Sequence, residues 1–154
     1  FSAEDTPKAG DGEQEAFQWI SRAASDGLPE AQYRLALLYS IGRGCPASAS
    51  QAVSWARAAA SRGHTGAMLF LASCLRHGEG VLRDLAGALA LTQRVIAETD
   101  GHLGRGAMEE IEALASAAER AEAQQLLKDN ETAASLVATI LLRSKAPRRT
   151  ASRA

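Results

Sequence analysis

Residues 31–63 read AQYRLALLYSIGRGCPASASQAVSWARAAASRG, and residues 67–80 begin the same pattern again as AMLFLASCLRHGEG. Sliding the chain against itself gives one clear self-match, at an offset of 36 residues, which aligns Trp19 with Trp55. Over residues 13–48, eleven positions are identical to the residue 36 places later, three of them glycines. Chance similarity between two alanine-rich stretches would not also align both tryptophans and these glycines. The chain therefore contains a tandem repeat.

One repeat unit has the pattern of a helix, a turn and a second helix. Ala31, Leu35 and Leu38 recur at helical spacing and predict one apolar face of a first helix. Gly42 follows the last periodic residue, where a glycine in the left-handed backbone conformation commonly ends a helix, and Gly44 allows the chain to reverse direction tightly. We therefore expect the first helix to end at Gly42.

The second helix of each unit also carries start and stop signals. Ser48 in one unit and Asp84 in the next stand where an N-cap is needed. Pro29 suits the first turn of a first helix, where its missing N–H costs nothing. The apolar face of the second helix carries Trp55, and we expect Trp19 and Trp55 to pack between the two helices of their hairpins.

The motif Ala31-x3-Leu35-x3-Tyr39-x2-Gly42-x-Gly44, continued by Trp55-x3-Ala59-Ala60-x2-Gly63-x3-Ala67, resembles the Sel-one-like repeat family, a relative of the tetratricopeptide repeats. The second copy has Gly78-Glu79-Gly80-Val81-Leu82-Arg83-Asp84, close to the family's glycine loop and acidic cap. In the first copy Cys45-Pro46-Ala47-Ser48 departs from that loop. The resemblance covers about residues 13–98. It implies an all-α, right-handed α-solenoid of helix-turn-helix repeats that works as a protein-binding adaptor.

The repeat pattern fades after Leu91, and two further helices are expected to cap the array. Residues 107–127 read as one long amphipathic helix, and a last helix begins at Asn130 or Thr132 and runs to Leu142. Its apolar residues would cover the exposed end of the stack, as terminal repeats must: Leu136, Val137, Ile140 and Leu141. The predicted organisation is an extension (1–12), repeats (13–99), a helical cap (100–142) and a basic tail (143–154).

Charge and composition bound the function. The net charge of −1 argues against a surface that binds nucleic acid as a whole. Residues 143–154 nevertheless hold five basic residues and no acidic one, so this tail is either solvated charge or an arm on an anionic surface. No stretch approaches the roughly 20 apolar residues of a spanning helix. The Phe1-Ser2 start resembles the residues left after mitochondrial presequence cleavage, which favours a mitochondrial location over a bacterial or cytoplasmic one.

A search for catalytic chemistry returns little. His64, His77 and His102 stand at loops or helix ends and are expected to be structural or solvent-facing. Cys74 and His77 share a helix, but two ligands fall short of a structural zinc site. Whether Cys45 and Cys74 form a disulfide depends on the distance between them in the fold, which the sequence does not give. The glycine pairs lack a preceding strand and a following Gly-Lys-Ser/Thr, so they are turns. We expect no enzyme, no cofactor and no metal.

Protein partners are therefore the expectation. In the related repeats first helices tend to line the concave surface, which by analogy makes Tyr33, Arg34, Phe70 and Arg76 candidate contacts. The tail adds Arg143, Lys145, Arg148, Arg149 and Arg153. The leading hypothesis is a scaffold or structural subunit of a larger assembly. The alternatives are an RNA-associated subunit that uses the tail, and a thiol- or metal-dependent assembly factor.

Overall fold

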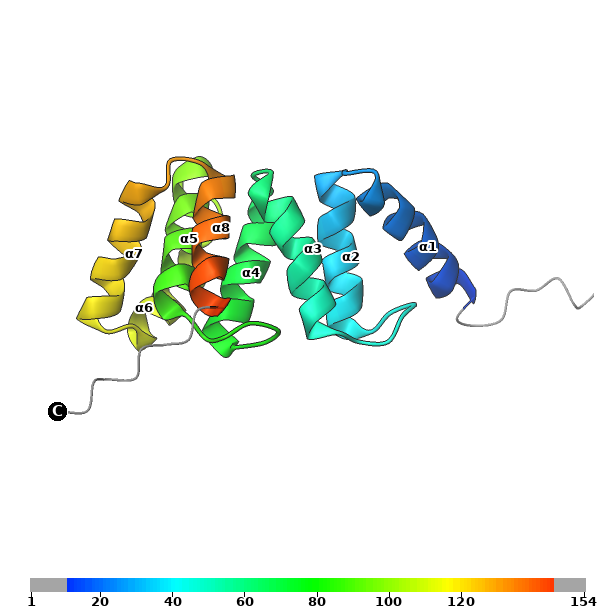
Figure 1. Cartoon of the computed structure of the whole chain (residues 1–154), viewed down its shortest axis with the longest axis horizontal. Coiled ribbons are helices and arrows are strands. Elements are labelled where there is room, and N and C mark those ends of the chain that lie inside the picture. Colours follow the sequence, from blue (N-terminus) through cyan, green and yellow to red (C-terminus); the bar gives the residue numbers. More distant parts are fainter. Residues whose placement is uncertain (1–10, 146–154) are drawn as a thin grey trace, which may run out of the picture.

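The computed structural model describes residues 11–145, and this part of the chain forms eight α-helices and no strand. From α1 to α6 each helix packs on the next along a row, and α7 packs on α5, so the described part of the chain is elongated rather than round (Figure 1). The expected all-α solenoid of helix-turn-helix units is confirmed. The helices are α1 (Asp11–Ser25), α2 (Pro29–Ile41), α3 (Ala49–Ser61), α4 (Thr65–His77), α5 (Leu85–Glu98), α6 (Arg105–Leu114), α7 (Ala117–Asp129) and α8 (Ala133–Lys145).

The helix boundaries follow the capping signals in the sequence. Gly42 and Gly78 end α2 and α4 in the left-handed conformation. The hydroxyl oxygen of Ser48 accepts the N–H of Gln51 at 3.3 Å, and a carboxylate oxygen of Asp84 accepts the N–H of Gly87 at 3.0 Å. Both residues therefore cap second helices, as predicted.

A second glycine in each turn, Gly44 after α2 and Gly80 after α4, lets the turn pack closely on the helix that precedes the hairpin's first helix. A Cβ atom on Gly44 would lie 2.5 Å from the carbonyl oxygen of Glu13, and one on Gly80 would lie 2.5 Å from that of Ala49. Gly80 follows Gly44 by 36 residues, and Ala49 follows Glu13 by the same 36 residues. The turn after α2 thus packs on α1 as the turn after α4 packs on α3, which demonstrates the repeat in three dimensions.

Trp19 departs from the expected packing. Its side chain is 62% exposed, whereas Trp55 is half-buried and Leu91, the next residue in the series, is fully buried. The three residues differ in exposure because their helices have different numbers of neighbours: α1 packs chiefly on α2, while α5 is enclosed by α4, α6, α7 and α8. The prediction that Trp19 lies between the helices of a hairpin is wrong.

The predicted long helix over 107–127 is also wrong, because it is two helices. Ala115 has an extended backbone between α6 and α7, and Ser116 caps α7. The Ser116 hydroxyl accepts the N–H of Glu119, and the Glu119 carboxylate accepts the N–H of Ser116. This capping box starts a new helix where the apolar periodicity alone would continue the old one.

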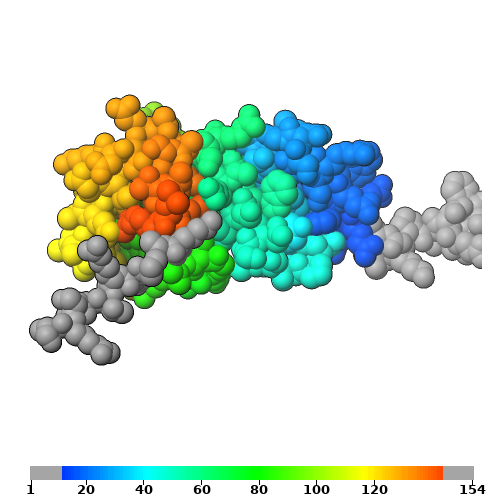
Figure 2. Space-filling view, in the orientation of Figure 1, coloured from blue at the N-terminus to red at the C-terminus, as the bar shows by residue number. Residues whose placement is uncertain are grey.

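Helix α8 turns back along the array and packs on α3, α5 and α7. In Figure 1 it stands in front of the α4–α5 hairpin, and in Figure 2 its orange-red surface meets the teal surface of α3. Thr132 begins this helix, since its hydroxyl accepts the N–H of Ser135 at 3.1 Å. The four apolar residues predicted to cover the stack are all buried: Leu136, Val137, Ile140 and Leu141.

The core runs from α3 to α8 and is built largely from alanine and leucine. Gly87 shows how closely α8 approaches α5, since a Cβ atom there would lie 2.8 Å from the side chain of Ile140. Asn130 joins α7 to α8 by donating to the Leu126 carbonyl and accepting from the hydroxyls of Ser135 and Thr139. Within the described residues no helix has the length and apolar character needed to cross a membrane.

Candidate functional site

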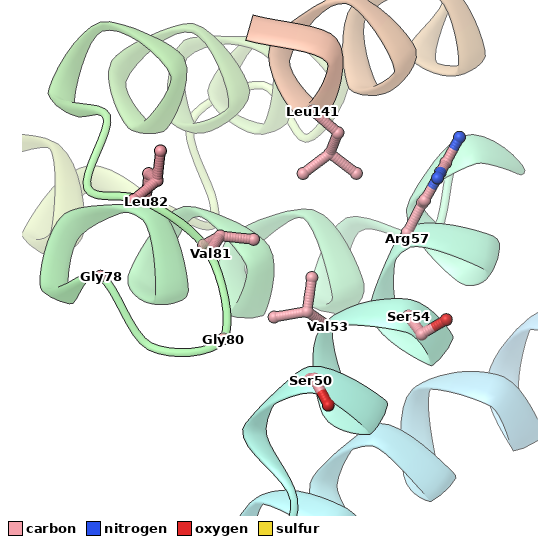
Figure 3. A pocket seen from close by; sticks show the side chains of 9 residues that line it. All are labelled: Ser50, Val53, Ser54, Arg57, Gly78, Gly80, Val81, Leu82 and Leu141. Atoms are coloured by element: carbon pink, nitrogen blue, oxygen red, sulfur yellow. The ribbon is translucent and has the colours of Figure 1, made fainter. Parts of the chain in front are cut away.

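An open groove of about 600 Å³ lies between α3 and α8 (Figure 3). We call it the α3–α8 groove. One side is formed by α3 and the other by the turn after α4 together with one residue of α8. The residues that line it are Ser50, Val53, Ser54, Arg57, Gly78, Gly80, Val81, Leu82 and Leu141.

The α3 side is mostly polar. Ser50, Ser54 and Arg57 are exposed and fall on one face of the helix because they are spaced by four and three residues. Figure 3 shows these three side chains along α3, with Val53 directed toward Val81. Hydroxyl and guanidinium donors thus follow one side of the groove.

The opposite side is apolar. Val81 and Leu82 come from the turn that Gly80 holds against α3, and Leu141 comes from the penultimate turn of the α8 apolar face. The Leu82 side chain is 54% exposed, while Val81 is half-buried and Leu141 is buried. An occupant of the groove would therefore cover Leu82 most of all.

Arg57 supplies the only charge among the lining residues. No described carboxylate lies within ion-pair distance of it. The other arginines in the helices from α2 to α5 differ, because Arg34, Arg76 and Arg94 each pair with a glutamate. The groove thus offers one positive charge that internal contacts leave available.

The predicted contact residues on first helices are only partly available. The Tyr33 ring packs 4.7 Å from the His64 ring, and Arg76 pairs with Glu110 of α6. Arg34 is exposed and pairs with Glu30 at 3.2 Å, and Phe70 is half-buried against the core. Arg34 and Phe70 occupy equivalent positions of successive repeats and so share a face, whereas Tyr33 and Arg76 also hold neighbouring helices.

The basic tail falls mainly outside the described residues. The residues of the tail outside the described range include Arg148, Arg149 and Arg153, and Lys145 is the last residue of α8. Arg143 belongs to the fold, because its guanidinium pairs with Glu122 and lies 3.8 Å from Asp84. This arginine fastens α8 to α7 and to the start of α5.

His64 and the two cysteines have structural surroundings, whereas His77 and His102 are exposed. Nδ1 of His64 accepts the N–H of Ala67 at 3.1 Å, so His64 is the N-cap of α4. Both cysteines are free thiols, and burial raises the pKa of Cys74 to about 11, with Glu79 adding to the shift. In the part of the chain that the structure describes, no three His, Cys, Asp or Glu side chains are grouped to hold a metal ion.

Sequence reasoning missed the α3–α8 groove. The apolar pair Val81-Leu82 after two glycines and the face of Ser50, Ser54 and Arg57 were both visible as patterns. What the sequence did not supply was the return of α8 to α3, which places Leu141 across from Arg57.

Comparison with known families agrees with this geometry. The Sel1 repeat matches residues 4–28, 29–64 and 65–95, in tandem and over more than half of the chain. The chain belongs to the Sel1-repeat family. The first match ends just before Pro29 starts α2, and the second corresponds to α2 and α3. Sel1-repeat proteins generally mediate protein–protein interaction, and this repeat type is a non-catalytic scaffold.

Two comparisons with known proteins give the scale of the likeness. The chain is 48% identical over 48 residues to the chitin synthase regulator SKT5 of Saccharomyces cerevisiae. The aligned residues are 31% of this chain and 7% of the regulator. A crystal structure of c5321, a protective antigen of uropathogenic Escherichia coli with an SLR fold, superposes with a TM-score of 0.75 at 25% identity. That match covers 95% of this chain and 32% of the antigen. The chain thus spans about a third or less of either relative.

Proposed function

We propose that this chain is a non-catalytic scaffold that binds protein partners. The observation that carries the proposal is the tandem of Sel1 repeats over residues 4–95. The α3–α8 groove supports it, because it is an open surface with an unpaired arginine among the described residues and an exposed leucine. Such a surface suits a polypeptide better than a reacting small molecule, since its polar groups do not converge on one point.

The arrangement of titratable side chains supports a non-catalytic role. His64 is engaged at both ring nitrogens by Ala67 and Glu30, and Cys74 is buried with a raised pKa. A nucleophile needs an adjacent base, and a thiol is reactive only as the thiolate. Reproducible turnover of a small molecule by the purified monomer would contradict this part of the proposal.

The experiment that tests scaffold function is partner identification followed by reconstitution. The full chain is tagged, purified with in-cell crosslinking, and its crosslinked peptides are identified by mass spectrometry. Each partner is then produced separately and mixed with the purified chain. We expect a stable complex on size-exclusion chromatography with crosslinks on α3, the turn after α4, or the exposed face of α2 and α4. If no purified partner forms a complex, the scaffold proposal fails.

RNA association is the alternative function, favoured by the five basic residues in 143–154. Arg143 must be left in place in its test, because it pairs with Glu122 and lies near Asp84. The appropriate variant deletes residues 146–154 and keeps α8 whole. Salt-dependent RNA binding that this deletion removes would favour the alternative, and equal binding with and without the deletion would contradict it.

A further inference from the structure

We infer that the α3–α8 groove binds a segment of a protein partner that presents an acidic side chain beside an apolar one. This inference rests on the proposed function, because it specifies the chemistry of the segment that the scaffold holds. The groove has one charged residue, Arg57, and one strongly exposed apolar residue, Leu82, on opposite sides. Figure 3 shows Leu82 and Arg57 on opposite sides of the groove, with Leu141 above and Val53 below, between them; the Arg57 side chain extends outward from α3.

Charge complementarity selects an acidic segment. Arg57 is exposed and has no described carboxylate partner, while Arg34, Arg76 and Arg94 are each paired. A guanidinium presents a planar fork of N–H donors that matches a carboxylate. Aspartate or glutamate in a partner would therefore complete the one pair that the fold leaves open among these arginines.

The apolar side selects a second feature of the same segment. Leu82 is 54% exposed beside Val81 and Leu141. Covering this leucine would remove apolar surface from water, which is favourable. Because the polar and apolar sides are opposite, the occupant must be two-faced, with its carboxylate toward α3 and its apolar side chain toward the turn after α4.

The groove is a property of this repeat and not of the repeat pattern in general. The residues 36 positions earlier are Phe17 for Val53, Ser21 for Arg57, Cys45 for Val81 and Pro46 for Leu82. Those counterparts carry no charge. Since α8 packs on α3, α5 and α7, no helix of residues 11–145 places a counterpart of Leu141 beside α1. The combination of cation and apolar wall arises where the end of the chain folds back on the array.

A single unpaired guanidinium also separates this inference from nucleic-acid binding. Binding to a phosphate polymer draws on several lysines and arginines along one surface. The lining of the groove has one such residue and two serine hydroxyls. We therefore commit to a protein segment.

The test uses a displayed library of random peptides, panned against the purified full chain. Enriched peptides are sequenced, synthesised with a fluorophore, and measured by fluorescence anisotropy. We expect enrichment of sequences with aspartate or glutamate next to leucine, isoleucine, valine or phenylalanine. Affinity should fall by about tenfold or more for Arg57→Glu and also fall for Leu82→Ser.

Matched controls come from the repeat itself. Ser21→Glu introduces the same charge at the position equivalent to Arg57, and Leu103→Ser removes another exposed leucine. Both should bind the peptides as the unmodified chain does. Replacing the acidic residue of a peptide by lysine should weaken its binding to the unmodified chain and restore its binding to Arg57→Glu. Circular dichroism of each variant confirms that it folds.

The outcomes distinguish the groove from the scaffold function. Enriched peptides that bind Arg57→Glu and Leu82→Ser unchanged would overturn the groove inference, while the scaffold proposal would stand on reconstituted complexes. Enrichment of basic peptides, or no enrichment, would overturn it as well. Failure of reconstitution with every purified partner is a separate result and would instead contradict the proposed function.

Discussion

Nε2 of His64 lies 2.6 Å from a carboxylate oxygen of Glu30, and this contact joins the start of α4 to the start of α2. Nδ1 of the same ring accepts the backbone N–H of Ala67, so Nε2 carries the proton and donates it to Glu30. Glu30 also accepts from Arg34. One histidine thus caps its own helix and ties it to the previous repeat.

The Glu30 contacts predict an acid-dependent contribution to stability. Hydrogen bonding from His64, and then from Arg34, holds the pKa of Glu30 below its ordinary value of 4.5. A carboxyl whose pKa is lowered by folding adds stability above its unfolded value, and that stability is lost as the pH falls through the folded value. We expect Glu30→Gln to lower the melting temperature near neutral pH, with a difference that shrinks below about pH 4.5.

Thermal unfolding at a series of pH values, followed by circular dichroism, measures this difference. Glu109→Gln is the matched control, since Glu109 is exposed and has no described partner. Its melting curve should follow that of the unmodified protein at every pH. A Glu30→Gln difference that grows as the pH falls would contradict the assignment.

The turn glycines predict two grades of destabilisation by alanine. Gly63 has a φ of +86° and open space around it, so Gly63→Ala should cost only backbone strain, about 1 kcal/mol. Gly44 and Gly80 have similar φ values, but a Cβ atom would meet a backbone oxygen at 2.5 Å. We expect Gly44→Ala and Gly80→Ala to lower the free energy of unfolding by clearly more than Gly63→Ala. Urea unfolding measures all three, and equal losses would show that the turns do not press on α1 and α3.

Local signals in the sequence were sufficient for most helix boundaries. Gly42, Ser48, Gly78 and Asp84 act within a few residues of their own position, so their roles follow from residue type and spacing. The break before α7 also had a local signal, the Ser116-x-x-Glu119 capping box. It was overlooked because the apolar spacing continues through it.

Features that depend on distant partners did not follow from the sequence. Trp19 and Trp55 are identical in the repeat alignment, yet their exposures differ because different helices surround them. The apolar face of α8 was predicted, but not that it would fold back to α3. The α3–α8 groove depends on that return, so neither its position nor the role of Arg57 could be deduced from residue patterns.

The two thiols should differ sharply in reactivity. Cys45 is partly exposed, whereas Cys74 is buried and its pKa is raised to about 11 by desolvation and by Glu79. Alkylation requires the thiolate. We expect one iodoacetamide adduct on the folded protein at neutral pH and two in denaturant, measured by intact mass. Cys45→Ser should remove the native adduct. Two adducts formed at equal rates, or a mass lower than the free-thiol form by two hydrogen atoms, as a disulfide would give, would contradict the structure.

The packing of α8 on α5 predicts that alanine substitutions at two nearby apolar residues lower the free energy of unfolding by different amounts. Ile140 is fully buried and approaches Gly87 of α5, while Leu142 is 68% exposed. Ile140→Ala removes packed methyl groups and leaves a cavity, so we expect a loss of about 2–5 kcal/mol in the free energy of unfolding. Leu142→Ala should change it by about 0.5 kcal/mol or less, as surface substitutions do.

Urea unfolding by circular dichroism measures both variants, and alkylation of Cys74 in the folded state adds a local readout of core opening. Because α8 forms one side of the α3–α8 groove through Leu141, Ile140→Ala should also weaken the peptides that bind there, whereas Leu142→Ala should leave them unchanged. Equal stability losses for the two variants would mean that α8 does not pack on α5 through Ile140, and the groove would then lose the contribution of Leu141 to its apolar side.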